Sequence, residues 1–404
     1  MINKASGINS VPFFNMEGEV FLIYLDNSAG ARPYPEVIET ITDVLQNHWG
    51  NASADNSFGQ DARVIIDNAT QQVANDINCA PDEIIWTSGA CEANSLAIMG
   101  IAHKHYTWLY TSKLEHTSIN KIANGFARFV DYNHCSFIEN NNDGLISLEN
   151  LESQLKKNKN DDWHLTLVSI SFANSEIGAI QDIKSIAEIV HQYDGILHVD
   201  ATQMYPWYKI DVQDLGIDMM SVSGQKFHCV KGIGFLYVKD GIELNSLICG
   251  SQQNERRGGS YPTHLIAAFG KALEITRQHN ATSGVKDLRD YLLDRLLHIE
   301  NVHLNGPLTN EWRLPNNISL TIDGVNASTL VTMCDLMGVI VAKGSACKSY
   351  EPEPSDALLA IGLTAEQALS TIRISLDEFN SLKEVDEAAD IITKLVKRIR
   401  NEEN

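Results

Sequence analysis

A lysine near the middle of the chain stands where it can act as a nucleophile beside a phosphate group. Lys226 follows Ser223, Gly224 and Gln225, and this segment comes directly after the apolar run Met219 to Val222. A hydroxyl and a glycine after a strand allow close approach to a phosphate, and a lysine amine can form a Schiff base with a carbonyl compound. Because Ser-Gly-x-Lys is common on its own, a solvated lysine at a strand end is the alternative.

A second segment predicts a place for the phosphate. Ser88-Gly89-Ala90-Cys91-Glu92 follows a predicted strand and opens a predicted helix. The first N-H groups of a helix have no partner within the helix and can bind an anion. An ordinary turn between strand and helix is the alternative for this segment.

Asp200 ends another predicted strand, and Gln203 follows it closely. A carboxylate there can keep a pyridine nitrogen protonated, so that the ring acts as an electron sink, and Gln203 can bond the ring hydroxyl. Aspartate at a strand end also serves as a loop cap. Together with Lys226 and the phosphate turn, Asp200 predicts pyridoxal phosphate as the cofactor.

Three further polar residues follow predicted strands. His116 comes just after one strand, where an imidazole can stack on a ring and move protons near neutral pH, although most single histidines have no such role. Asn174 and Ser175 close another strand, so their side chains can face the cofactor or the substrate. Asn174 can equally cap the next turn.

The C-terminal third of the chain supplies two more candidate site residues, a cysteine and an arginine. Cys347 lies in a Gly/Ser loop that is unlike core sequence, and Lys343 and Lys348 on either side favour its thiolate. An incidental exposed cysteine is the alternative. Arg373 lies within a short apolar run, where a buried guanidinium needs an anion, either a substrate carboxylate or a structural ion pair.

Apolar runs and amphipathic segments alternate along the elements that must position these residues. The predicted strands are 83–87, 108–111, 164–171, 196–200, 219–223 and 234–238, and the helices between them are 91–105, 118–128, 147–157 and 184–193. This alternation predicts an α/β fold with a mostly parallel sheet covered by helices. In such sheets, ligands bind at the carboxyl ends of the strands.

We predict an N-terminal arm and two domains. Residues 1–20 form the arm, 21–262 the large cofactor-binding domain and 263–404 a smaller α+β domain that carries the cysteine loop. The large domain begins with a strand at 21–26 and helices at 34–49 and 59–77. The smaller domain has a long helical stretch at 264–297, strands at 317–322, 339–342 and 372–375, and a last helix at 382–399.

Composition narrows the class of partner. The net charge of -21, from 31 basic and 52 acidic residues, repels nucleic-acid phosphates, so a basic protein partner is expected rather than direct nucleic-acid contact. There is no apolar run of membrane-spanning length and no signal-peptide pattern, so we expect a cytoplasmic protein without membrane contact. The seven cysteines are scattered without a C-x-x-C pattern, so neither a disulfide framework nor a metal site is expected.

The motifs, taken in order, resemble the pyridoxal-phosphate cysteine desulfurases (NifS/IscS-like, class V aminotransferase family) over about residues 22 to 398. They are Leu-Asp-Asn-Ser-Ala, Ser-Gly-Ala-x-Glu, Glu-His, Asn-x-Glu-Ile-Gly, His-Val-Asp-Ala-Thr-Gln, Ser-Gly-x-Lys, Gly-Ser-Ala-Cys and Ile-Arg-x-Ser. The resemblance implies the fold of type I pyridoxal-phosphate enzymes.

The resemblance also implies roles for the cofactor site. Lys226 would carry the cofactor, Asp200 and Gln203 would hold its ring, and His116 would stack on the ring and assist proton transfer. The further cofactor-binding positions are Ser223, Gln225, Ala90, Cys91 and Ser175. Ser260 lies where the family has a threonine that reaches the cofactor phosphate of the partner subunit, which implies a homodimer.

By the same likeness, the substrate is L-cysteine. Arg373 and Asn174 or Ser175 would hold its carboxylate, and Cys347 would attack its sulfur. The products would be L-alanine and a persulfide on Cys347, which a sulfur-acceptor protein would then receive.

The sequence departs from the family pattern at several positions. Cys91 stands where threonine is usual, Gln225 where histidine is usual and Ser175 where asparagine is usual. The other departures are Gly30 and the segments 51–56 and 250–257. These departures leave a cofactor-binding scaffold without turnover as one alternative. A selenocysteine lyase or a class V transaminase of the same fold is another, because it would share Lys226 and Asp200.

The end of the chain indicates which process receives the sulfur. After Lys397 to Asn404 there is no extended tail of the kind that housekeeping members use to dock an iron-sulfur scaffold. We therefore expect a dedicated sulfur donor, for example for DNA phosphorothioation. Sulfur delivery to tRNA thiolation or to iron-sulfur clusters stays open.

Overall fold

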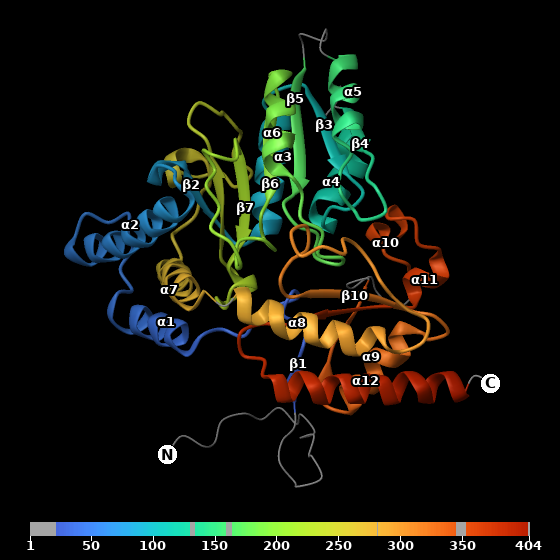
Figure 1. The fold of residues 1–404 in the computed structure, drawn as a ribbon. Helices are drawn as coiled ribbons and strands as arrows, with labels where there is room; N and C mark the ends of the chain where they lie inside the picture. The colour runs from blue at the N-terminus through green and yellow to red at the C-terminus, as the bar shows by residue number, and fades with distance from the viewer. Residues whose placement is uncertain (1–21, 130–133, 159–163, 281, 345–352, 403–404) are drawn as a thin grey trace.

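The computed structural model describes residues 22–129, 134–158, 164–280, 282–344 and 353–402 (Figure 1). The predicted arm at 1–20 and Cys347 lie outside these residues.

A seven-stranded sheet forms the centre of the larger part of the molecule. Its strands, in spatial order, are β2 (Ile84–Thr87), β8 (Gly234–Val238), β7 (Met219–Ser223), β6 (Ile196–Asp200), β5 (Leu165–Ser171), β3 (Thr107–Ser112) and β4 (His134–Ile138). β8 pairs antiparallel with β2 and β7, whereas the other pairs are parallel. The carboxyl ends of β5, β6 and β7 therefore lie at one edge of the sheet.

Helices cover both faces of this sheet (Figure 1). One face packs against α1 (Pro35–Asn47), α2 (Ser57–Ile77), α5 (Leu148–Asn158), α6 (Ile183–Gln192) and α7 (Thr263–His279). The other packs against α3 (Ala90–Ala102) and α4 (Thr117–Phe129). Ile84 and Trp86 face the first group and Ile85 the second, as the two-residue period of a strand requires.

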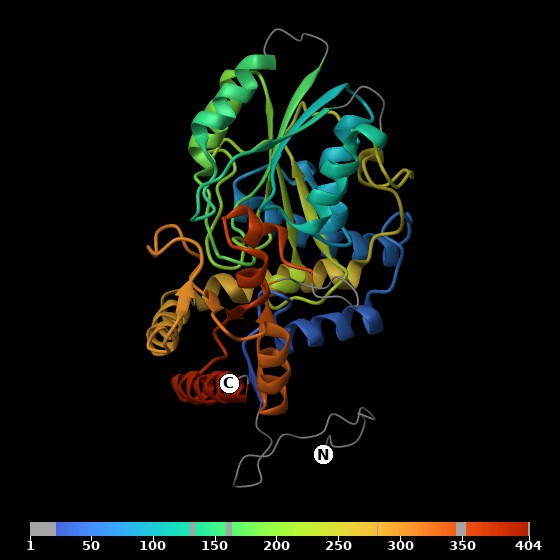
Figure 2. The ribbon, with the colours of Figure 1, turned by 90° about the vertical axis from the view of Figure 1, so that its right-hand side faces the viewer.

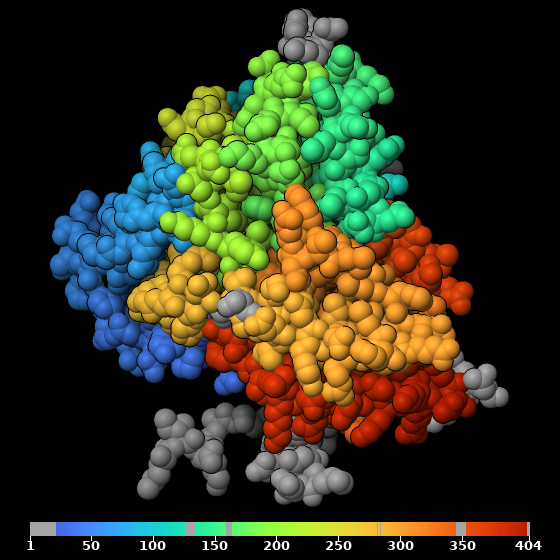
Figure 3. All heavy atoms as spheres, in the orientation of Figure 1, coloured from blue at the N-terminus to red at the C-terminus, as the bar shows by residue number. Residues whose placement is uncertain are grey.

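A four-stranded antiparallel sheet forms the centre of the C-terminal part. Its strands, in spatial order, are β12 (Ala342–Lys343), β13 (Thr371–Ser375), β10 (Asn317–Ile322) and β9 (Val302–Leu304). The helices of this part are α8 (Thr282–Leu297), α9 (Ala327–Leu336), α10 (Asp356–Ala360), α11 (Ala365–Leu369) and α12 (Leu382–Glu402). Figure 2 shows most of these orange and red segments below the sheet of the larger part, and Figure 3 shows the orange segments packed against the green ones.

The beginning of the described chain is built into the C-terminal part. β1 (Ile23–Tyr24) pairs in parallel with β11 (Val339–Ile340). Ile23 and Leu25 are buried in the same hydrophobic cluster as β10, β13 and α12. The N-terminal segment is thereby fixed next to β13, which carries Arg373.

The predicted α/β fold class, with a mostly parallel sheet covered by helices, is confirmed, but several elements differ. The predicted long helical stretch at 264–297 is helical but consists of two helices: α7 ends at His279, and the left-handed φ of 46° at Asn280 separates it from α8. The predicted strand at 339–342 is two short strands, β11 and β12, that pair in different sheets. β4 and β9 were not predicted, because β4 is a partly exposed edge strand and β9 has only three residues.

None of the helices in the described ranges is both long enough and apolar enough to cross a membrane.

Arg313 ties the two parts of the molecule together. Its buried guanidinium donates hydrogen bonds to the carbonyl oxygens of Ile177 at 3.0 Å, Asn305 at 2.5 Å and Pro307 at 2.7 Å. Ile177 follows β5 in the larger part, whereas Asn305 and Pro307 follow β9 in the C-terminal part. Burial lowers the pKa of Arg313 to about 9, so the side chain stays cationic at neutral pH.

Arg313→Leu is expected to lower the free energy of unfolding by about 3 kcal/mol or more, because it leaves several buried carbonyl groups without a donor. Urea unfolding followed by circular dichroism measures this change. Lys271→Met is the control, since Lys271 makes an exposed pair with Glu274 that is worth less than about 1 kcal/mol. Equal stability of Arg313→Leu and the unchanged protein would contradict the role of Arg313.

Candidate active site

A cavity of about 350 Å³ opens at the carboxyl ends of β5, β6 and β7. It is lined by most of the residues that the sequence singled out. They are Ala90, Cys91, His116, Asn174, Ser175, Asp200, Gln203, Ser223, Gln225, Lys226 and Arg373. The fold therefore brings these residues from distant parts of the chain into one site.

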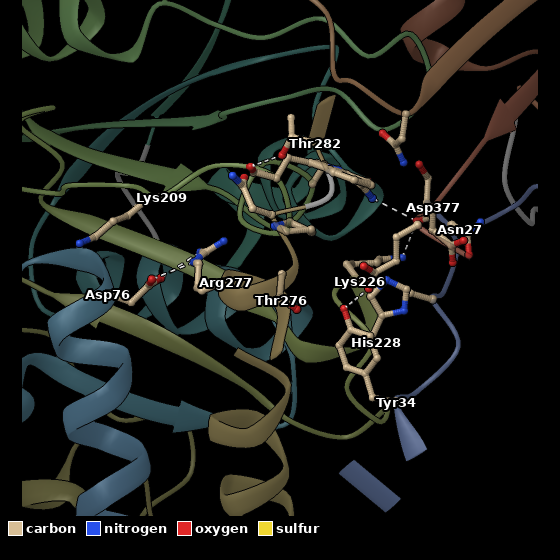
Figure 4. Close-up of a pocket in the computed structure, with 18 residues that line it drawn as sticks. Asn27, Tyr34, Asp76, Lys209, Lys226, His228, Thr276, Arg277, Thr282 and Asp377 are labelled. Carbon is tan, nitrogen blue, oxygen red and sulfur yellow. Dashed lines mark hydrogen bonds and ion pairs between the residues drawn. The ribbon is translucent and has the colours of Figure 1, made fainter. Parts of the chain in front are cut away.

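Lys226 ends a short turn, Gly224–Lys226, that follows β7. Its Nζ donates hydrogen bonds to the carbonyl oxygens of Ser28 and Ala29, both at 2.8 Å. The amine also lines a second cavity of about 410 Å³, on whose border Figure 4 shows it. Lys226 therefore lies between the two cavities.

The electrostatic surroundings of Lys226 favour an unprotonated amine. Burial lowers its pKa to about 8, and the positive charge of Arg373 acts in the same direction. Asp26, Asp200 and Cys91 act in the opposite direction. An amine with this pKa is partly unprotonated, and therefore nucleophilic, near neutral pH.

Two glycines allow the start of α3 to approach the ends of β7 and β8. Gly89 has a φ of 142° and precedes the first turn of α3 without a side-chain capping bond. A Cβ on Gly89 would lie 3.4 Å from the hydroxyl of Ser223, and a Cβ on Gly234 would lie 2.7 Å from the Cα of Gly89. The hydroxyl of Ser223 is thereby placed beside the N-terminus of a helix.

The same helix start carries Ala90 and Cys91 in its first turn, where the N-H groups have no acceptor in a preceding turn. The side chain of Glu92, in the same turn, does not take part in anion binding. Its carboxylate accepts a hydrogen bond from the N-H of Ser88 at 2.7 Å and pairs with Arg257 at 2.8 Å. Although burial opposes it, hydrogen bonds from Arg257 and Ser88 keep the pKa of Glu92 below its usual value.

Asp200 is buried at the end of β6, with its side chain fixed by two donors. Its Oδ2 accepts a hydrogen bond from Nδ2 of Asn94 at 2.8 Å, and its Oδ1 accepts one from the N-H of Thr202 at 3.0 Å. Asn94 lies on α3, so this contact joins the phosphate turn to the carboxylate.

His116, Gln203 and Gln225 complete the wall of the cavity. His116 is exposed, and its Nδ1 accepts a hydrogen bond from the N-H of Ser118 at 3.2 Å. Gln203 donates to the carbonyl oxygen of Ser28 at 3.1 Å. Gln225 is half-buried in the turn before Lys226.

Arg373 is buried on β13 and makes the ion pair that was one of its two predicted alternatives. Its Nη2 lies 2.7 Å from Oδ1 of Asp26, and its Nη1 donates to the carbonyl oxygen of Ser175 at 3.4 Å. The guanidinium also lines the cavity. A substrate carboxylate can therefore reach it as well.

Asn174 caps the turn after β5, as one of its alternatives predicted. Its Oδ1 accepts hydrogen bonds from the N-H groups of Glu176 and Ile177, and its Nδ2 donates to the carbonyl oxygen of Leu114 at 2.7 Å. It lines the cavity at the same time, so its contact with a substrate stays a prediction.

One predicted residue, Ser260, is not among those that line this cavity, and another lies outside the described part of the chain. Ser260 is exposed on the loop before α7, and its contact with a partner subunit stays a prediction. Cys347 lies outside the described residues, between Gly344 and Glu353.

Three residues of the site were not predicted. Asp26 and Asn94 bind Arg373 and Asp200, respectively. Glu115 accepts a hydrogen bond from Oγ of Ser171 at 2.5 Å, and burial raises its pKa to about 8. Asp26 stands within the motif Leu-Asp-Asn-Ser-Ala and Glu115 within Glu-His, and these motifs were the available sequence signal.

The donors of the cavity fit a phosphorylated pyridine aldehyde. A helix start and a serine hydroxyl can hold a phosphate, a fixed carboxylate suits a protonated ring nitrogen, and Lys226 can bond the aldehyde. Buried hydroxyl oxygens of Ser28 and Thr202, which also line the cavity, have no hydrogen-bond partner among the described residues. The residues present therefore fit pyridoxal phosphate.

Comparison with known proteins identifies the protein family of this chain. The model of the family "Aminotransferase class-V" matches residues 23–388, so the chain belongs to this family. Enzymes of this family use pyridoxal phosphate.

Within this family, the chain belongs with the cysteine desulfurases. It is 33% identical over 385 residues to "Cysteine desulfurase IscS" of Dictyoglomus turgidum, covering 94% of this chain and 95% of that protein. It is 36% identical over 389 residues to the IscS of Pseudomonas entomophila, covering 94% and 93%.

Solved structures agree with this assignment. A "NIFS-LIKE PROTEIN" superimposes with a TM-score of 0.85 at 27% identity, covering 93% of this chain and all of that one (100%). A structure described as "SspA in complex with cysteine" superimposes with a TM-score of 0.76 at 29% identity, covering 89% and 99%.

In the cofactor-free protein, Lys226 is expected to react with acetic anhydride with a pH midpoint near 8, because burial lowers its pKa. Mass spectrometry of the labelled peptides measures this midpoint. Lys184 is the internal control, since its exposed amine pairs with Asp214 and has a raised pKa. A midpoint above about 10 for Lys226, the range of an ordinary lysine, would contradict the lowered pKa.

Proposed function

We propose that this protein is a cysteine desulfurase that converts L-cysteine to L-alanine and transfers the sulfur to Cys347 as a persulfide. The observation that carries the proposal is that Lys226, Asp200 and Arg373 line one cavity. The IscS relatives and the cysteine complex of the SspA structure support cysteine as the substrate.

The protein's own groups have separate tasks in this reaction. When bound, pyridoxal phosphate withdraws electrons from an attached amino acid and so makes its Cα and Cβ bonds reactive. Asp200 would hold a proton on the ring nitrogen, and Gln203 and His116 would bind the ring. Lys226 would carry the cofactor, and its free amine would accept and return the Cα proton. Arg373 binds the substrate carboxylate.

Ser223 and the first turn of α3, with Ala90 and Cys91, would hold the phosphate. The main-chain N-H groups serve whatever side chain stands there, so a thiol at Cys91 in place of a hydroxyl is compatible with binding. Gln225 and Ser175 complete the cofactor wall, and Asn174 shapes the turn on the substrate side.

Cys347 is the sulfur acceptor in this proposal. Its thiolate attacks the substrate sulfur, so an S-S bond forms and the C-S bond of cysteine breaks. The electron pair of that bond stays with the substrate carbon, which takes up a proton and becomes the methyl group of alanine. Cysteine and the Cys347 thiol thus give alanine and the persulfide without an external oxidant.

Alanine and sulfide release from L-cysteine with a reductant is the test. The unchanged protein is expected to form both, and Cys347→Ser to lose at least about 99% of the activity while it keeps the yellow colour of the bound cofactor. Cys249→Ser is the matched control, because Cys249 is exposed and does not line the cavity.

Other results would separate the alternatives. Equal sulfide release by the unchanged protein and by Cys347→Ser would show that Cys347 takes no part in the reaction. It would favour the mechanism of a selenocysteine lyase. Keto acid in place of alanine would indicate a transaminase. A coloured protein that forms neither product would be a scaffold.

The proposed homodimer has a candidate interface on α1, α2 and the segment between them, in the blue region of Figure 3. Ile38, Leu45, Trp49, Phe58 and Val64 are all more than half exposed. The rings of Trp49 and Phe58 lie 5.1 Å apart. An exposed apolar patch of this kind is typical of a subunit interface.

We expect the double change Trp49→Asp with Phe58→Asp to halve the mass measured by light scattering, because two charges would be buried in the interface. Leu308→Asp is the control, since Leu308 is 79% exposed and lies apart from this patch. A dimeric mass for the double variant, or a monomeric mass for the unchanged protein, would contradict this interface.

The acceptor of the persulfide is a protein in this proposal. The net charge of -21 favours a basic protein partner over direct contact with nucleic acid. We propose that the enzyme is a cytoplasmic, dedicated sulfur donor, for example for DNA phosphorothioation, with the partner protein acting on the DNA.

A further inference from the structure

One turn of the chain contacts both the candidate carboxylate-binding arginine and the cofactor lysine. The turn Asp26–Ala29 follows β1, and the N-H of Ala29 bonds the carbonyl oxygen of Asp26 at 3.0 Å. At its first residue, the carboxylate of Asp26 pairs with Arg373 at 2.7 Å. At its end, the carbonyl oxygens of Ser28 and Ala29 hold the amine of Lys226.

Ser375 fixes this turn to the strand that carries Arg373. Its hydroxyl accepts a hydrogen bond from the N-H of Ser28 at 2.9 Å. Its carbonyl oxygen accepts bonds from the main-chain N-H and the side-chain Nδ2 of Asn27, at 3.2 and 3.0 Å. Arg373 and Ser375 are two residues apart on β13, so both point to the same side of the strand. The turn and the strand therefore form one unit.

The guanidinium of Arg373 can bind a substrate while Asp26 stays in place. Arginine has five N-H groups, and the bonds to Asp26 and to the carbonyl oxygen of Ser175 use one Nη2 and one Nη1 group. The Nε of Arg373 is buried and has no hydrogen-bond partner among the described residues. Further N-H groups thus remain for a substrate carboxylate.

Charge gives Asp26 a second effect, on Lys226. Among the described residues, the charged or titratable groups that act on this amine are Arg373 on β13, Asp26 on the turn, Asp200 on β6 and Cys91 on α3. Arg373 is the only one of these four that is cationic, and Asp26 is its direct ion-pair partner. The carboxylate of Asp26 therefore offsets the effect of Arg373 on the lysine.

We propose that Asp26 is a positioning residue, which orients the Arg373 guanidinium for the substrate carboxylate and balances the charge of Arg373 at Lys226. The inference rests on the proposed function, because it assigns the substrate carboxylate to Arg373. It differs from the reading in which Asp26 competes with the substrate for Arg373.

The test uses the holoenzyme and two variants. Asp26→Asn keeps an oxygen that can accept from Nη2 but removes the charge, and Asp26→Ala removes both. The pH midpoint of the visible absorption of the lysine-bound cofactor reports the charge at Lys226. The change of that absorption with propionate, a carboxylate that cannot react, reports the affinity of Arg373.

Both variants are expected to lower the pH midpoint by about one unit, because each removes a negative charge near a cationic nitrogen. Only Asp26→Ala is expected to weaken propionate binding and to raise the KM for L-cysteine, each by about tenfold, since the guanidinium is no longer held. Propionate is expected to raise the midpoint of the unchanged protein, because it neutralises Arg373.

Asp76→Asn is the matched control. Asp76 pairs with Arg277 at 2.8 and 2.9 Å, and Figure 4 shows this pair at the other end of the second cavity from Lys226. This variant is expected to change neither the midpoint nor the propionate affinity.

An unchanged midpoint in Asp26→Asn, or tighter propionate binding by Asp26→Ala, would overturn the proposal. The second result would show that Asp26 competes with the substrate. If Asp26→Ala does not fold, the midpoint of the coloured Asp26→Asn protein still decides the charge effect. Propionate needs no turnover, so these results stand even if no alanine is formed from cysteine, which would contradict the proposed function instead.

Discussion

The amine of Lys226 has to lie among charged groups without being permanently protonated, and the architecture of the site depends on this constraint. Burial and the charge of Arg373 lower its pKa, whereas Asp26 and Asp200 set a limit to the effect. These groups come from β13, the N-terminal turn and β6. The N-terminal segment must therefore pack with the C-terminal part, as the pairing of β1 with β11 ensures.

The periodicity of the sequence was enough to predict the central sheet. Apolar runs that alternate with amphipathic helices allow few arrangements other than a covered parallel sheet. The elements that were missed depend on information that periodicity lacks. β4 is an edge strand with partly exposed residues, and the break at Asn280 depends on one left-handed residue. β11 and β12 share one apolar run but pair with different strands, which only the tertiary structure decides.

The candidate site was predictable to the extent that each residue stands at the end of a strand. Lys226, Asp200 and His116 follow strands whose carboxyl ends meet at one edge, so their meeting follows from the fold class. Asp26 and Asn94 could not be assigned in this way, because their roles come from contacts with Arg373 and Asp200 across different elements. For Arg373 and Asn174, the sequence allowed either a structural contact or a contact with the substrate. The structural contacts, an ion pair for Arg373 and a turn cap for Asn174, are present, and both residues also line the cavity.

The buried residues around Asp200 leave its negative charge without a neighbouring positive charge on the same strand. His198 lies two residues earlier on β6, with Ser169 and Ser221 at 2.9 Å from its two ring nitrogens. A neutral imidazole has one donor and one acceptor, and two hydroxyl groups satisfy both. Burial lowers the pKa of His198 to about 4, although Asp200 acts against this. If the imidazole of His198 were protonated, its positive charge would offset the negative charge of the Asp200 carboxylate. Because burial keeps His198 neutral, the negative charge of Asp200 remains available for a protonated ring nitrogen in the cavity.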